Sequence, residues 1–207
     1  MPDPDYAVAV CGFGRCGSTM AMQMLIAGGM RPGQASKPPY EGDPTAIPGR
    51  DFTGTCIKIL DDYVTAAAVA GPTRAWRFIW LDRDPIEQGR SYIKFLDWMG
   101  PVTGIYGGTF TAEQVARTYE RDRPARITQL RQAGQLLVLD FAAVLRRPRK
   151  AASLIRREIF PGLNVDQAAA QVHQRDPACR PDMAVELSFA NWPGRPPAST
   201  PPARSRT

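Results

Sequence analysis

The chain has 207 residues, of which 43% are hydrophobic and 22% charged, and its formal net charge at pH 7 is +6. This composition is typical of a globular protein and excludes a fibrous repeat or a largely disordered body, while the length suits one domain with its own core. No apolar run approaches the roughly 20 residues that a membrane span needs, so we expect none.

Half of the net positive charge lies in the last 17 residues, "NWPGRPPASTPPARSRT", which contain three arginines and no acid. We therefore predict one domain over residues 1–190 and a disordered, proline-rich tail over 191–207. The remaining charge is too small to indicate nucleic-acid binding and suits a site for one small, highly charged ligand.

The cysteines and the N-terminal segment indicate a compartment. Cys11, Cys16, Cys56 and Cys179 show no paired metal-binding spacing, and we interpret them as reduced thiols. The first ten residues, "MPDPDYAVAV", have neither the basic nor the apolar region of a secretory signal. We expect a soluble, cytoplasmic protein.

Strand and helix patterns alternate along the chain. Continuous apolar runs predict buried strands at 6–11, 54–60, 76–82 and 135–141. Helical patterns fall at 18–28, 61–70, 85–98, 111–132 and 148–159. We predict an α/β fold whose mostly parallel sheet of about four to five strands has helices on both faces.

Local signals mark some boundaries. Asp84, Pro85 and Glu87 predict a capped helix start directly after the third strand. Pro124 should break or kink the helix at 111–132. Residues 30–53 are rich in proline and glycine and form an unusually long connection, which is more often functional than a plain linker.

The first strand leads through a glycine-rich turn into a helix, in "VAVCGFGRCGSTMAMQML" at residues 8–25. This layout is typical of a phosphate-binding loop, in which backbone N–H groups at a helix N-terminus face the anion. Against the pattern G-x-x-x-x-G-K-[ST], Gly12, Gly17 and Thr19 are in register. Ser18 replaces the lysine, and the cation of the loop is Arg15.

The segment "FGRCGSTM" resembles the phosphosulfate-binding loop of the sulfotransferases, usually Pro-[Lys/Arg]-Ser-Gly-Thr-Thr. Arg15 matches the basic residue, Cys16 the serine and Gly17 the glycine, followed by a hydroxyl pair. The resemblance implies that the 5'-phosphosulfate of 3'-phosphoadenosine-5'-phosphosulfate is bound by Gly14, Arg15, Cys16, Gly17, Ser18 and Thr19.

A second segment, "WRFIWLDRDPIEQGRSYIKF", resembles the part of the same family that holds the 3'-phosphate. Arg83, Pro85 and Ser91 keep the spacing of the family's arginine, proline and serine. A strand-end guanidinium and a helix hydroxyl would together distinguish a ribose 3'-phosphate from a bare hydroxyl. The alternative is that Arg83 is a surface charge and Ser91 a neutral helix residue.

A third, looser resemblance is "LLVLDFAAVLRRPRKAASLIRREIFPGL". Phe141, Val144 and Pro148 match the tyrosine, leucine and proline of the family's late strand and helix, but Ala142 and Ala143 replace its two acids. The resemblance covers about residues 6–165.

The general base of the family is missing. Lys58 matches the family's lysine on the second strand, but Leu60 stands at the position of its histidine and Ile57 at that of its glutamate. Asp61 or Asp62 would follow that strand into the site and act as the base, or would instead cap the next helix.

Three further features allow more than one interpretation. His173 follows a polar late helix and is expected on the surface. In the family, a C-terminal basic segment completes the binding of the 3'-phosphate. Judged by its position alone, Arg180 could replace that segment. The segment 99–110, "MGPVTGIYGGTF", is a lid, an acceptor wall or an ordinary connector.

These observations predict a sulfotransferase that moves a sulfuryl group to a hydroxyl or amine of a small molecule, glycan or lipid, with Lys58 near the transferred group and no metal. One alternative is an ATP- or GTP-dependent kinase or NTPase, because Asp82 and Asp140 end apolar strands and Thr19 could bind magnesium. Another is a nucleotide-binding protein without turnover. The acceptor and the oligomeric state stay open.

Overall fold

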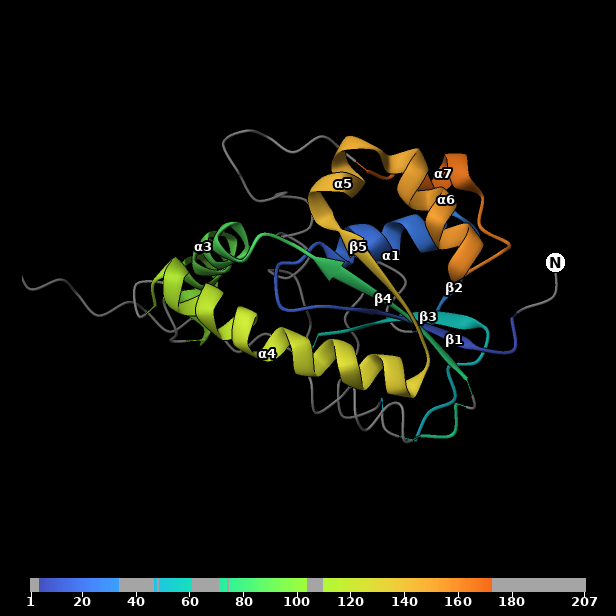
Figure 1. Ribbon diagram of the computed structural model, residues 1–207, viewed down its shortest axis with the longest axis horizontal. Helices are drawn as coiled ribbons and strands as arrows, with labels where there is room; N and C mark the ends of the chain where they lie inside the picture. Colours follow the sequence, from blue (N-terminus) through green and yellow to red (C-terminus); the bar gives the residue numbers. More distant parts are fainter. Residues whose placement is uncertain are drawn as a thin grey trace, which may run out of the picture.

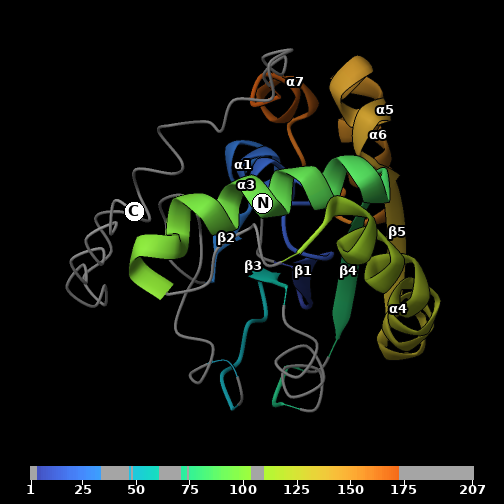
Figure 2. The ribbon, with the colours of Figure 1, turned by 90° about the vertical axis from the view of Figure 1, so that its left-hand side faces the viewer.

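The computed structural model describes residues 4–33, 47, 49–60, 71–73, 75–103 and 110–172, with the side chains of 98–103 left out. The centre of the molecule is one five-stranded sheet in the order β2-β3-β1-β4-β5, and every pair of neighbours is parallel (Figures 1 and 2). The strands are β1 (Ala7–Cys11), β2 (Arg31–Pro32), β3 (Thr55–Ile59), β4 (Trp76–Asp82) and β5 (Gln135–Asp140). The predicted α/β class with a parallel sheet is confirmed.

Six helices of the described residues lie around this sheet. They are α1 (Ser18–Ala27), α3 (Pro85–Thr103), α4 (Ala112–Ala133), α5 (Phe141–Arg146), α6 (Pro148–Glu158) and α7 (Val165–Ala169). Helix α4 covers one face of the sheet, and α1 and α5 to α7 cover the other face.

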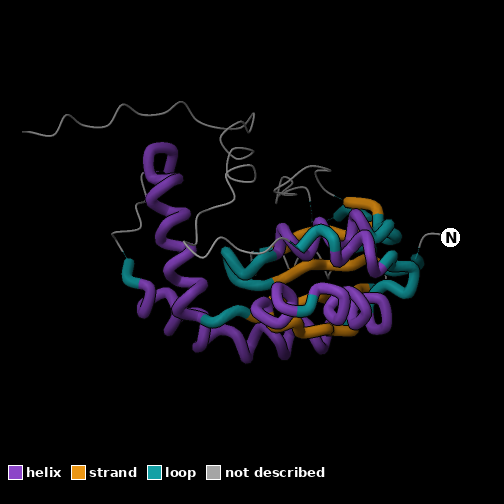
Figure 3. Tube along the Cα trace, turned by 90° about the horizontal axis from the view of Figure 1, so that it is seen from above, coloured by secondary structure: helices purple, strands orange, loops and turns teal. Residues whose placement is uncertain are grey.

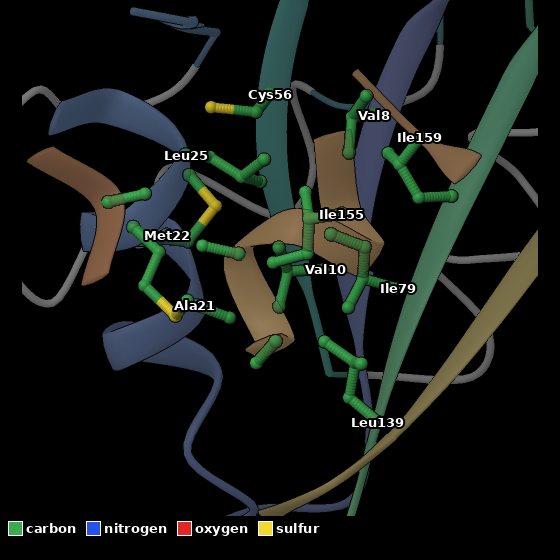
Figure 4. Packing of buried hydrophobic residues seen from close by; sticks show 14 of the residues in the cluster. Val8, Val10, Ala21, Met22, Leu25, Cys56, Ile79, Leu139, Ile155 and Ile159 are labelled. Carbon is green, nitrogen blue, oxygen red and sulfur yellow. The ribbon is translucent and has the colours of Figure 1, made fainter. Parts of the chain in front are cut away.

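The two faces of the sheet carry separate cores, because successive side chains of a strand point to opposite faces. On one face, Val8 and Val10 of β1 pack against α1 and α6, and Figure 4 shows them among Met22, Leu25 and Ile155. On the other face, Ala7, Ala9 and Cys11 pack with large side chains of β4 and with α4, among them Trp76, Phe78, Trp80 and Leu130. Both faces of the strands are therefore buried, as the continuous apolar runs predicted.

The carboxyl ends of the strands lie at one edge of the sheet. β1 sits between β3 and β4, so the chain leaves β1 toward one side of the sheet and later returns to the other side. In open α/β sheets ligands bind outside the strand ends at such a reversal. Helix α3 follows the end of β4, and Figures 1 and 3 show it standing across the direction of the strands at this edge.

The first turns of two helices agree with simple capping rules. The backbone N–H of Glu87 donates to the Asp84 carboxylate at 2.8 Å, so Asp84 caps α3 as predicted. Thr111 caps α4 in a reciprocal capping box with Gln114, a signal that the sequence interpretation did not use.

Two expectations were wrong in detail. Phe141 is not the last residue of a strand but the first of α5, because the Asp140 carboxylate accepts the N–H of Ala143 and starts a helix there. Pro124 does not end its helix, since α4 runs on to Ala133. Pro124 and Glu120 are exposed, so the carbonyl that loses its helical donor lies on the solvent side.

The short strand β2 and the helices α5 and α7 were not predicted. β2 has only two residues and falls at the start of the expected connection over 30–53, most of which lies outside the described residues. The predicted helix at 61–70, the domain boundary at 190 and the tail also lie outside them. No helix in the described ranges has the length and apolar character to cross a bilayer.

Candidate functional site: a glycine loop held by the next strand and helix

The glycine loop, residues 12–17, connects β1 to α1 at the carboxyl edge of the sheet. It turns tightly, with the N–H of Cys16 donating to the carbonyl of Phe13 at 3.1 Å. Gly17 precedes α1 in a left-handed conformation with φ 104° and makes no side-chain cap. The first turn of α1 therefore begins with backbone N–H groups that have no helical acceptor, which is the usual setting for an anion at a helix N-terminus.

Gly17 is required at its position for two reasons. Its φ lies in the region that side chains disfavour, and a Cβ atom there would lie 2.5 Å from the ring of Phe141. Phe141 is the first residue of α5, so the start of this helix packs directly on the loop.

Arg15 adopts an unusual backbone conformation for a residue with a side chain. Its φ is 68°, and among the described residues it is the only non-glycine residue with a positive φ. Such a conformation is uncommon and persists where surrounding contacts enforce it. The guanidinium of Arg15 lies over the ring of Phe95 on α3, with Cζ 5.0 Å from the ring centroid.

Arg83 lies against the loop from the end of β4. Its Nη1 donates a hydrogen bond of 2.8 Å to the carbonyl of Arg15, and its guanidinium lies over the ring of Phe141 at 4.9 Å. Its Nε is 3.7 Å from the carboxylate of Glu87. Arg83 is only 8% exposed, so the interpretation of this residue as a plain surface charge is wrong. Its contacts tie the two predicted phosphate-binding segments together.

Gln88 was missed by the sequence interpretation. It is 3% exposed, and its Nε2 donates to the carbonyls of Phe13 at 3.0 Å and Gly14 at 2.9 Å. The signal that could have identified it is a polar residue one helical turn after the cap Asp84, on the face of α3 that continues to Phe95.

Lys58 and Ser18 lie near the thiol of Cys16 on the α1 face of the sheet. Lys58 is on β3 beside Val10 of β1 and is 5% exposed. Burial raises the pKa of the Cys16 thiol to about 11, against smaller opposing effects of hydrogen bonds from Ser18 and of the Lys58 charge. A buried cation thus stands close to the start of α1, where charge on an anion would be stabilised.

Aromatic residues of α3 and α4 border the loop. Ser91 is half-buried and lies on the same side of α3 as Gln88 and Tyr92 by helical spacing. Tyr92 lies beside Gly14, where an added Cβ would be 3.5 Å from its ring. Tyr119 of α4 stacks on Phe13 with ring centroids 4.6 Å apart, and burial raises its pKa.

The two strand-end aspartates that suggested a kinase have other partners. The Asp82 carboxylate pairs with Arg123 of α4, and the Asp140 carboxylate caps α5. Burial raises the pKa of Asp82, and the charge of Arg123 acts in the opposite direction. Both carboxylates therefore already have a partner in the protein, whereas a kinase would direct one of them toward magnesium.

Several predicted residues cannot be placed. Asp61, Asp62, His173 and Arg180 lie outside the described residues, as do residues 104–109 of the segment 99–110, whose first five residues continue α3. Within the described ranges, no three His, Cys, Asp or Glu side chains gather as a metal site would require. The described cysteines, Cys11, Cys16 and Cys56, form no disulfide.

Comparisons with known proteins find similar chains among solved structures. No protein-family model and no curated protein sequence matches the chain. Among solved structures, a sulfotransferase from Alicyclobacillus acidocaldarius is similar to it with a TM-score of 0.42 and 14% sequence identity, over 92% of each chain. A similarity this low does not establish a shared function, so function is inferred from the residues of the site.

Proposed function

We propose that the chain is a sulfotransferase that binds 3'-phosphoadenosine-5'-phosphosulfate and transfers its sulfuryl group to a hydroxyl or amine acceptor. The observation that supports this most is the hydrogen bond from Arg83 to the Arg15 carbonyl. It joins the glycine loop to the strand-end arginine, two segments 68 residues apart that independently resemble the two phosphate-binding elements of one family.

In this proposal the loop and the start of α1 bind the 5'-phosphosulfate. Gly14, Cys16 and Gly17 shape the backbone, and Arg15 supplies positive charge. The hydroxyls of Ser18 and Thr19 stand in the first turn of α1 and can donate further hydrogen bonds. The 3'-phosphate would be held by Arg83, which also supports the loop, together with Ser91 on the following helix.

Sulfuryl transfer forms a bond from the acceptor oxygen or nitrogen to sulfur and breaks the bond from sulfur to the bridging oxygen of the 5'-phosphate. Negative charge grows on that leaving oxygen, and Lys58 is the buried cation that would stabilise it. The acceptor loses a proton, and Asp61 remains the sequence-based candidate for the base. The protein cations would do what magnesium does for a nucleoside triphosphate, so we propose no metal.

Transfer can be tested with sulfur-labelled donor and a panel of phenol, sugar, lipid and amine acceptors. Lys58→Met keeps the length of a buried side chain and removes its charge, so turnover should fall by roughly 10²- to 10³-fold while donor binding persists. Asp61→Asn should lower turnover by about 10²- to 10⁴-fold with unchanged donor affinity if Asp61 is the base. Lys94→Met, at an exposed position of α3, is the matched control and should leave both unchanged.

The outcome also separates the alternatives. Tight binding of the donor without transfer to any acceptor would favour a nucleotide-binding protein that does not turn over. Phosphoryl transfer from ATP with magnesium would replace the proposal by the kinase interpretation, which the engagement of Asp82 by Arg123 disfavours.

A further inference from the structure

Gln88 connects α3 to the glycine loop by two hydrogen bonds from a buried side chain. Both of its neighbours are carbonyl oxygens, of Phe13 and Gly14, so only the NH₂ end of its amide can face them. Each of the two amide hydrogens has one acceptor, and the side chain is 3% exposed. Its donor capacity is therefore fully used to hold the loop.

These two bonds fix the orientation of successive peptide planes. In a trans peptide, the carbonyl of one residue and the N–H of the next point in opposite directions. Holding the carbonyls of Phe13 and Gly14 on the α3 side turns the N–H groups of Gly14 and Arg15 away from Gln88. Arg83 acts in the same way on the next carbonyl, and the N–H of Cys16 then points back to Phe13.

We propose that Gln88 is a positioning residue, which sets the conformation of the glycine loop and so determines how tightly the loop binds its anion. It contacts the loop backbone and not the ligand. The inference about affinity rests on the proposed nucleotide site, whereas the inference about loop conformation does not.

The effect of losing these bonds should appear in the loop first. Without the donor, the peptide planes of residues 13–15 can rotate, and an anion must then pay the ordering cost of the loop when it binds. Two lost hydrogen bonds of ordinary strength correspond to about a 10- to 100-fold loss of affinity for adenosine 3',5'-bisphosphate.

The test compares two Gln88 variants with two controls. Gln88→Met has a similar length and no donor, and Gln88→Glu keeps the shape but presents a carboxylate to two carbonyls. Lys94→Met introduces the same residue at an exposed position of α3. Ile155→Val, a buried substitution in the α1 face core, lowers stability without touching the loop.

Two quantities are measured on each protein: the dissociation constant of adenosine 3',5'-bisphosphate and the hydrogen-exchange rate of the Cys16 amide, which is protected by its bond to Phe13. We expect both Gln88 variants to lose affinity and to exchange this amide faster, while both controls stay like the parent. A purely structural role would instead make the Gln88 variants resemble Ile155→Val, with a lower melting temperature and unchanged affinity.

Parental affinity in both folded Gln88 variants would overturn the proposal. If the parent itself does not bind the bisphosphate, the proposed function fails, and the Cys16 exchange rate alone decides the role of Gln88. Faster exchange in the variants would then support loop positioning, and an unchanged rate would refute it.

Discussion

The guanidinium of Arg83 donates a 2.8 Å hydrogen bond to the carbonyl of Arg15, so the end of β4 directly supports the loop that follows β1. The same guanidinium lies over Phe141, whose ring also packs on Gly17. One buried arginine thus contacts the loop backbone and the helix start that packs on the loop. Arg83 would serve two roles in nucleotide binding, which its substitution can separate.

Arg83→Met should weaken adenosine 3',5'-bisphosphate more than AMP, because these ligands differ only in the 3'-phosphate. Losing a hydrogen bond to a charged group costs roughly 1.5 to 3 kcal/mol, and the weaker loop support should cost both ligands alike. Isothermal titration of both ligands measures the difference. Equal losses for the two would leave Arg83 with loop support as its only role.

Arg15→Ala should weaken binding of the bisphosphate by about 1.5 to 3 kcal/mol, because it removes a charge from the loop. The stability of the ligand-free protein should change little, since the side chain lies in a ligand loop and its backbone φ of 68° is unfavourable for alanine as for arginine. Arg15→Gly relieves that backbone restriction and should bind as weakly as Arg15→Ala. Parental affinity in both variants would remove Arg15 from the site.

Gly17→Ala should destabilise the protein by about 1 to 3 kcal/mol, because alanine is strained at a φ of 104°. The new methyl group would also meet the ring of Phe141, and Phe141→Leu in the same chain should recover part of the loss. Chemical denaturation of the single and double variants gives the coupling. Additive losses would show that the ring does not restrict this position.

Raising the pH should destabilise the protein in part through Cys16. Burial raises the folded-state pKa of this thiol from 9.0 to about 11, so above pH 9 the unfolded chain loses the proton first. The stability contributed by the neutral thiol is present below pH 9 and is lost between pH 9 and 11.

Cys16→Ala should remove that part of the slope, which is at most about 1.4 kcal/mol for each pH unit. Urea denaturation under reducing conditions from pH 8 to 11 tests this, with the difference between parent and variant cancelling the titration of other groups. Parallel curves for the two proteins would show that Cys16 ionises normally in the folded chain.

The fold was largely predictable because local patterns and tertiary burial agree. β1, β3, β4 and β5 are continuous apolar runs with both faces covered, and Asp84 with Pro85 marks the start of α3. The two-residue strand β2 has no pattern of its own to detect. α4 is not broken at Pro124, because this residue lies on the solvent side of the helix, and a local sequence rule does not contain that information.

The candidate site was predictable only where a residue belongs to a motif. Arg15, Gly17, Arg83 and Ser91 have the spacing of known phosphate-binding segments, and the first three do meet at the loop. Gln88 belongs to no motif, because its role comes from two carbonyls that lie 74 and 75 residues away in the chain. Contacts of this kind depend on the packing of α3 across the sheet edge.

The proposed function depends most directly on which nucleotide the folded chain prefers. A ligand that binds only the folded state raises the melting temperature by mass action, so one thermal-shift experiment can compare adenosine 3',5'-bisphosphate with ADP, AMP and ATP with magnesium at equal concentration. We predict a clearly larger shift for the bisphosphate, because Arg83 and Ser91 should add contacts that only a 3'-phosphate can use. An equal or larger shift with ATP and magnesium would contradict the proposed function and favour a kinase or NTPase.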